Sequence, residues 1–207
     1  MKNLNFLILF FFGLNLFAQK FTKEEKLLIQ SSLTDTMRVL NRNNPSDSGI
    51  LKSISIPINP RHKLTQELAG KMLVAVKKEG GVGIAAPQVG INRRMFWAQR
   101  FDKAEKPFEL FINPEILWSS DLMQKGPEGD LSFDERGLVM RNYAILIRYQ
   151  NLKGETQTEV LEGLTSVIFQ HERDHLDGIL LTDRIKEQEN MIFEQASGKS
   201  DLYFLKN

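Results

Sequence analysis

The chain has 207 residues, of which 26% are charged and 42% hydrophobic, and its formal net charge is +1. This near-neutral balance argues against nucleic acid or an acidic membrane surface as a partner. Cysteine is absent, which excludes disulfide bonds, thiolate metal ligands and lipoprotein attachment.

The first 18 residues are typical of a secretory signal peptide. Lys2 supplies a positive start, residues 4–17 are mostly apolar, and Ala18 offers a small residue for cleavage before Gln19. The apolar run is shorter than the roughly 20 residues of a membrane-spanning helix. We therefore expect an exported protein, periplasmic or secreted, with no stable membrane insertion after cleavage. An uncleaved membrane anchor is the alternative, because Leu16 is not the small residue preferred at that position.

The next part of the chain reads as two helices separated by a loop and a short strand. Residues 22–25 match a capping box and predict a helix that runs to about residue 40. The composition of residues 41–49 predicts a loop, and the alternation over 54–56 suits a short strand. Apolar spacing predicts a second helix over residues 64–79, which Gly80 ends.

Strands dominate the middle of the chain. The predicted strands are residues 95–101, 108–112, 144–150 and 156–161. A further helix is expected after Gly163, and helices and strands do not alternate strictly. The predicted fold class is therefore α+β.

The most informative motif lies on this last helix, where residues 171–175 read His-Glu-Arg-Asp-His. Side chains at positions i and i+4 share one face of a helix, so His171 and His175 can hold one metal ion. Glu172 can then reach a water beside that ion, which is the arrangement of metal-assisted hydrolysis. Val167 and Ile168 precede the motif at helical spacing. The histidines thus continue an apolar face, which disfavours a surface helix with two chance histidines.

Two further segments carry polar residues in distinctive settings. Residues 81–88 form a glycine-rich turn that ends on Gln88, without the lysine of a phosphate loop and without a GxGxxG pattern. Nucleotide binding is therefore excluded for this segment. Residues 128–132 read Glu-Gly-Asp-Leu-Ser and supply Asp130.

In this order and spacing, residues 81–88, 128–132 and 170–178 resemble the signature segments of the peptide deformylases. Members of that family are metallohydrolases that remove the formyl group from N-formylmethionine at the start of bacterial peptides. The resemblance implies antiparallel sheets packed around a central helix that carries the HExxH motif. The implied segments are a signal peptide (1–18), a partly helical N-terminal extension (19–53), a deformylase-like domain (54–185) and a C-terminal tail (186–207).

The resemblance implies that Asp130, His171 and His175 hold one divalent metal ion, Fe2+ or Zn2+. The family normally has cysteine as its third ligand, in the sequence Glu-Gly-Cys-Leu-Ser, whereas this chain has Asp130. Two histidines and a carboxylate suit both zinc and non-haem Fe(II). Two interpretations stay open at this point: Asp130 is a working ligand, or it marks a decayed site.

The remaining roles also follow from the resemblance. Glu172 would act as the general acid and base, and the Gln88 amide with the Leu131 backbone N–H would stabilise the oxyanion. Gly83 and Gly81 would let the backbone approach the substrate closely.

Three functions are compatible with these observations. The first is an exported deformylase-like hydrolase that acts on N-formylmethionyl peptides or on another small N-acyl amide. The second is a degenerate, non-catalytic family member that binds peptide or metal. The third is an HExxH zinc endopeptidase whose third ligand would be one of the downstream acids, namely Asp183, Glu187, Glu189 or Glu194.

Overall fold

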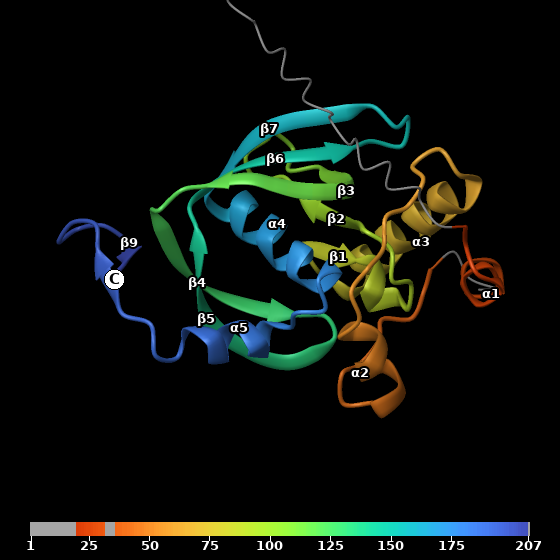
Figure 1. Cartoon of the computed structure of the whole chain (residues 1–207), viewed down its shortest axis with the longest axis horizontal. Coiled ribbons are helices and arrows are strands. Elements are labelled where there is room, and N and C mark those ends of the chain that lie inside the picture. The colour runs from red at the N-terminus through yellow and green to blue at the C-terminus, as the bar shows by residue number, and fades with distance from the viewer. Residues whose placement is uncertain (1–19, 32–35, 207) are drawn as a thin grey trace, which may run out of the picture.

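Two antiparallel sheets form the framework of the protein (Figure 1). The computed structural model describes residues 20–31 and 36–206, so the predicted signal peptide lies outside the described residues. The five-stranded sheet has, in spatial order, β1 (Gly83–Ala85), β2 (Met95–Gln99), β3 (Phe108–Ser119), β6 (Ala144–Gln150) and β7 (Thr156–Glu162). The four-stranded sheet has β5 (Phe133–Asn142), β4 (Met123–Asp130), β9 (Leu202–Leu205) and β8 (Phe193–Gln195).

The helix that carries the histidines, α4 (Gly163–Leu176), lies between the two sheets (Figure 1). It contacts β1 and β2 of one sheet and β5 of the other. Its Phe169 is fully buried and packs edge-on against Phe96 and Phe111, with ring centroids 5.0 and 5.1 Å apart. Edge-to-face aromatic contacts of this kind fix a helix against a sheet. The α+β class and the central position of this helix are therefore confirmed.

A second core forms around α3 (Lys63–Glu79), which confirms the helix predicted over residues 64–79. Gly80 ends this helix in the left-handed conformation (φ 69°). The N-terminal helix α1 (Lys23–Ser31) packs on α3 through the fully buried Ile29. The predicted capping box is present, because the Thr22 hydroxyl and the Glu25 carboxylate each accept a backbone N–H of the other residue. The N-terminal extension is thus part of the core.

The structure corrects the element boundaries between residues 31 and 51. The first helix ends at Ser31 rather than near residue 40, and residues 36–40 are not helical. The segment predicted as a loop (41–49) overlaps α2 (Pro45–Leu51), which starts with an Asn44 side-chain cap and a proline at its first turn. Leu51 is fully buried, so tertiary packing stabilises a helix that composition alone did not indicate.

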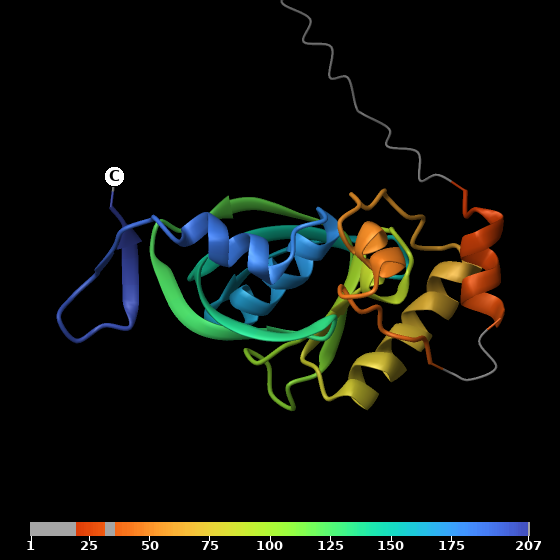
Figure 2. The same cartoon turned by 90° about the horizontal axis from the view of Figure 1, so that it is seen from below.

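The predicted strand over residues 54–56 is reduced to one bridge, between Ile56 and Arg93. Several further elements were not predicted, among them β1, β4 and β5. The helix η1 (Ala86–Val89) follows β1, and α5 (Leu181–Gln188) follows α4. The tail, left without an assignment above, forms the hairpin β8–β9, which extends the smaller sheet beyond β4 (Figure 2).

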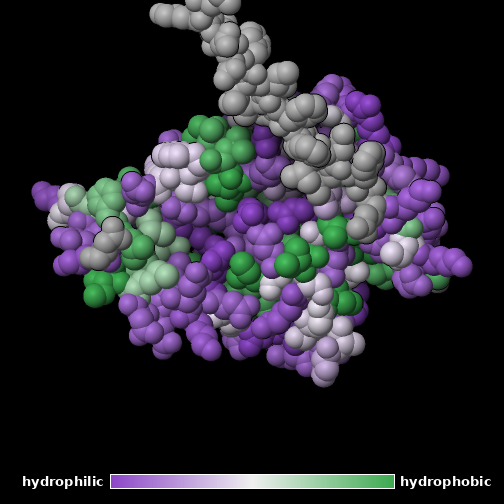
Figure 3. Space-filling model, viewed as in Figure 1, coloured by the Kyte–Doolittle hydropathy of each residue, from purple (hydrophilic) through white to green (hydrophobic). Residues whose placement is uncertain are grey.

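The tail also carries apolar surface. Figure 3 shows apolar side chains gathered over this end of the molecule, and Ile192 is 65% exposed. Among the described residues, none of the helices has the length and apolar character needed to cross a membrane.

The ion pair between Glu25 and Arg93 leads to a prediction about stability. Arg93 is 1% exposed and donates two hydrogen bonds to Glu25, at 2.7 and 2.6 Å. Glutamine keeps the capping box but loses the charge. We expect Glu25→Gln to lower the free energy of unfolding by about 3 kcal/mol, because it removes the charge of a carboxylate that binds the buried Arg93. Urea denaturation monitored by circular dichroism measures this.

The matched control for that prediction is Glu67→Gln, since Glu67 pairs with Lys63 on the exposed face of α3. A change of at most about 1 kcal/mol is expected there. Equal losses in the two variants would contradict the assignment of a stabilising role to the Glu25–Arg93 pair.

Candidate metal centre

Asp130, His171 and His175 converge on one point between β4 and α4. Each offers one ligand atom, and these atoms lie within 4.8 Å of one another. The helix presents both imidazoles on one face, with ring centroids 5.0 Å apart. Asp130 is the last residue of β4, and the ladder between β4 and β5 shifts register next to it. This irregularity turns the Asp130 carboxylate towards the helix.

The distances among these atoms fit a metal ion. The Oδ2 atom of Asp130 lies 3.3 Å from Nε2 of His175 and 3.9 Å from Nε2 of His171, and the two nitrogens are 3.3 Å apart. Bonds of about 2.0–2.2 Å around a tetrahedral zinc place neighbouring ligand atoms about 3.3–3.6 Å apart. Two of the three distances match this range, and the 3.9 Å between Asp130 and His171 is somewhat longer. Oδ2 is buried and forms no hydrogen bond with the described residues. A buried carboxylate oxygen in this state is expected where a cation binds.

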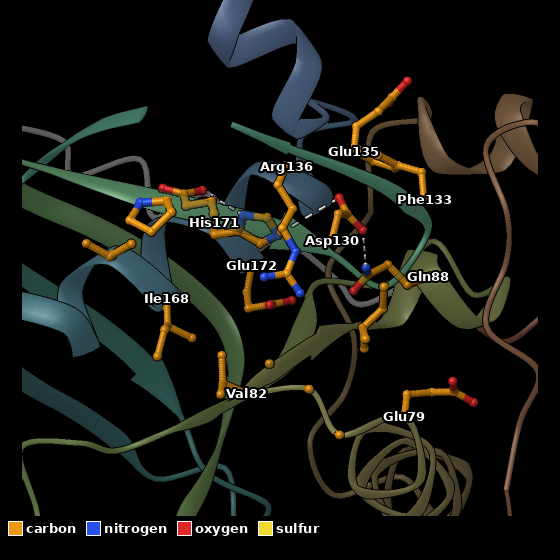
Figure 4. A pocket seen from close by; sticks show the side chains of 18 of the residues that line it. Glu79, Val82, Gln88, Asp130, Phe133, Glu135, Arg136, Ile168, His171 and Glu172 are labelled. Atoms are coloured by element: carbon orange, nitrogen blue, oxygen red, sulfur yellow. Dashed lines mark hydrogen bonds and ion pairs between the residues drawn. The ribbon is translucent and has the colours of Figure 1, made fainter. Parts of the chain in front are cut away.

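Glu172 lies beside this point but outside the three-ligand group. The residue is 4% exposed and lines a pocket that opens onto the metal-binding group (Figure 4). A Cβ atom at Gly83 would lie 2.2 Å from Oε1 of Glu172. Glycine is therefore required at position 83, because any side chain there would displace the carboxylate. Gly81 has a similar but weaker constraint, since its Cβ would lie 2.9 Å from Leu131.

Behind the histidines lies a buried network of ion pairs that the sequence did not indicate. Nδ1 of His171 lies 2.8 Å from Glu128, and Arg141 donates to both oxygens of Glu128 at 2.8 and 2.9 Å. Arg141 also binds Asp174 at 2.6 Å, and Asp174 binds Arg184 from α5. A carboxylate on the second ring nitrogen orients a metal-binding imidazole and raises its basicity. The sequence feature that could have indicated this network is the position of Asp174 inside the HExxH motif.

The charges around the centre are strongly coupled. Burial lowers the pKa of His175 to about 4, so this ring is neutral and able to bind a metal. Burial opposes charge on His171 as well, but the bond to Glu128 and the nearby carboxylates raise its pKa to about 9. Burial, with Asp130 and Glu128 nearby, raises the pKa of Glu172 to about 8. A cation bound here would replace the proton that this cluster of carboxylates attracts.

A pocket of about 510 Å³ opens onto this point (Figure 4). Gln88 lies on one side of it and Arg136 extends across it. Leu131 also lines the pocket, whereas Glu128 forms hydrogen bonds with Arg141. The apolar residues that line the pocket are Val82, Pro127, Leu131, Phe133, Leu164, Val167 and Ile168. Val167 and Ile168 belong to the apolar face predicted for this helix, whereas Val82 lies in the glycine-rich segment 81–88 and Pro127 precedes residues 128–132. The pocket can therefore hold an apolar side chain next to the metal centre.

Two of the four downstream acids proposed for an endopeptidase have other partners. Asp183 accepts the backbone N–H of Leu180 at 3.0 Å, and Glu187 pairs with Arg184 at 2.6 Å. Within the described part of the chain, the group of three acidic or histidine residues that could hold a metal is the one containing Asp130. The geometry thus favours Asp130 as the third ligand over a residue of α5.

Comparison with known proteins places this geometry in a family. The family model described as Polypeptide deformylase matches residues 37–191, a range that starts before the Ile54 expected from the motifs. The peptide deformylase of Caulobacter vibrioides is 39% identical over 153 residues, which cover 72% of this chain and 87% of that protein. The peptide deformylase of Thermotoga neapolitana is 37% identical over 147 residues, covering 70% and 87%.

A solved structure has the same fold. The class I type b peptide deformylase from Acinetobacter baumannii, with Met-Ala-Ser bound, superposes with a TM-score of 0.65 at 36% identity. The superposition covers 72% of this chain and 98% of that one.

Proposed function

The chain belongs to the peptide deformylase family, and we propose that it is a metal-dependent hydrolase that removes the formyl group from N-formylmethionyl peptides or from a related N-acyl amide. The observation that carries this proposal is the convergence of Asp130 Oδ2 with the two imidazoles, next to the buried Glu172. It supports the interpretation of Asp130 as a working ligand, because a decayed site has no reason to keep these ligand spacings.

Two imidazoles and one carboxylate suit Zn2+ or Fe2+. Such a cation acts as a Lewis acid and allows water to ionise near neutral pH. Glu172 takes the proton of the attacking water and delivers it to the leaving amine. The Leu131 backbone N–H and the Gln88 amide donate to the oxygen that becomes negative in the transition state. Gly83 leaves room for the Glu172 carboxylate that transfers the proton, because Glu172 occupies the space where a side chain at position 83 would lie.

The pocket supports a peptide as the substrate. Its apolar lining offers a site for an aliphatic side chain such as that of methionine. The relative from Acinetobacter baumannii has been solved with Met-Ala-Ser bound. Since nascent chains are deformylated in the cytoplasm, an exported enzyme would act on free formyl peptides or on another small amide.

The experiment that tests the proposal combines metal content with turnover of formyl-Met-Ala-Ser by residues 19–207. We expect about one divalent ion per chain, together with turnover that a chelator abolishes and Zn2+ or Fe2+ restores. Bound metal without turnover of any formyl peptide would favour the non-catalytic alternative. A chain that binds no divalent ion would contradict the metal centre itself.

The location of the protein is a separate prediction. Lys2, the apolar run and the junction of Ala18 with Gln19 lead us to propose export with cleavage after residue 18. N-terminal sequencing of the protein from fractionated cells is expected to start at Gln19, in the periplasm or the medium. Recovery of residues 1–18 on a cytoplasmic protein would contradict export and restore nascent chains as substrates.

A further inference from the structure

Gln88 is held in one orientation before any substrate arrives. It belongs to the helix η1, it is 1% exposed, and its Oε1 accepts the backbone N–H of Ala85 at 2.9 Å. The bond to Ala85 leaves the Nε2 end of the amide facing β4 (Figure 4). The orientation of this amide is therefore set by the backbone of its own turn.

The Nε2 end binds Asp130. Nε2 donates to Oδ1 of Asp130 at 3.0 Å, and the backbone N–H of Ser132 donates to the same oxygen at 2.8 Å. With two donors on Oδ1, the other oxygen faces the imidazoles and has no hydrogen-bond partner among the described residues. The two oxygens of one carboxylate thus have different environments, one with hydrogen-bond donors and one beside the histidines.

We propose that Gln88 is a positioning residue for the metal ligand Asp130. One amide hydrogen holds Oδ1 together with the Ser132 N–H, so that Asp130 offers Oδ2 alone. Nε2 also donates to the Ser132 hydroxyl at 3.4 Å, a long bond that a substrate oxygen can replace. A thiolate has a single ligand atom and offers no second oxygen for the amide to hold, so this role exists because the third ligand is a carboxylate. The inference rests on the proposed metal centre but not on the activity.

The test is a cycle of four proteins whose Zn2+ affinity is measured by competition with a chromophoric chelator. Gln88→Met keeps the volume of the side chain and removes the donor. In the natural chain we expect it to weaken Zn2+ binding about 10- to 100-fold, the usual effect of losing a group that orients a metal ligand. In the Asp130→Cys background, Gln88→Met is expected to change the affinity by less than about threefold.

Gln88→Met removes the hydrogen bond between Ala85 and Gln88 in both backgrounds. A purely structural effect would therefore weaken Zn2+ binding equally in both, whereas a positioning effect would appear only when residue 130 is aspartate. Equal weakening in the two backgrounds, or none in either, would overturn the proposal. If Gln88→Met does not fold, Gln88→Asn serves in its place, since the arm shortened by one carbon withdraws the same donor.

A second readout is the visible absorption of the Co2+-loaded protein. Without the Gln88 donor, Oδ1 keeps only the Ser132 N–H and has a lone pair free for the metal. Gln88→Met is therefore expected to weaken the absorption as the coordination number rises. An unchanged spectrum would count against the proposal. A protein that binds Zn2+ as expected but hydrolyses neither formyl peptides nor other N-acyl amides would contradict the proposed function and leave this inference standing.

Discussion

Glu172→Gln is expected to keep the metal and to lose about 10²- to 10⁴-fold in turnover, the range of a general acid–base group. Glutamine has the shape of glutamate and still fits against Gly83, where a Cβ would lie 2.2 Å from the carboxylate. It cannot accept the proton of the attacking water. Because Glu172 lies outside the group of three ligands, the metal content should not change.

The measurement is kcat for formyl-Met-Ala-Ser alongside the metal content of the same preparation. Glu67→Gln on the exposed face of α3 is the matched control and should retain full turnover, because Glu67 pairs with Lys63 away from the pocket. Turnover that persists in Glu172→Gln would remove Glu172 from the mechanism. Loss of metal in that variant would instead make it a ligand.

The helix α4 and its histidines could be predicted because their signals are local. Apolar residues at helical spacing and two histidines four positions apart are fixed by the period of a helix. The third ligand came only from the resemblance to a family, since nothing between residues 130 and 171 indicates that they meet. The structure brings Asp130 within 3.3 Å of His175.

The hairpin β4–β5 was not predicted, because several of its residues have a low propensity for strands. Gly126, Pro127 and Gly129 are residues that strands disfavour, and three consecutive charges follow from Asp134. The hairpin forms because its ends are tied to the rest of the fold. Arg141 binds Glu128 within the hairpin and Asp174 on α4, and Gly137 lies against Ile185 of α5. Contacts of this range cannot be read from a local pattern.

The same limit applies to the partners of the charged residues. Glu128 lies closer in the chain to Arg136 than to Arg141, yet it pairs with Arg141. Arg136 lines the pocket instead. Both arginines lie on β5, and only the position of the strand beside α4 decides which of them is buried. Residue type gave the chemistry of this region, and tertiary packing selected the partners.

Asp130→Cys is expected to raise deformylation of formyl-methionyl peptides above that of the natural chain. The other groups that the family resemblance assigns to catalysis are present, since Gln88, Leu131 and Glu172 line one pocket. Cysteine places its ligand atom one bond closer to the backbone than aspartate does, which returns the cation towards Glu172. It also removes the acceptor of the Gln88 amide, whose bond to Asp130 measures 3.0 Å.

An amide released from Asp130 has the hydrogen that bound Oδ1 available for the oxyanion. A tenfold gain in rate corresponds to about 1.4 kcal/mol of transition-state stabilisation, which is within what positioning can supply. The assay is carried out anaerobically with Fe2+ or Ni2+, because a thiolate beside iron is oxidisable. Asp121→Cys, at an exposed turn between β3 and β4, controls for the presence of a thiol.

A fall in activity would show that the centre is built around the carboxylate. In that case the hydrogen bond from Gln88 to Asp130 would raise activity by fixing the position of Oδ2. This gain would exceed the loss caused by using an amide hydrogen that could otherwise stabilise the oxyanion. The affinity cycle then distinguishes the two contributions, because it measures the position of the ligand without turnover. Low activity together with strong, Gln88-dependent Zn2+ binding would indicate a site adapted to an amide other than the formyl group.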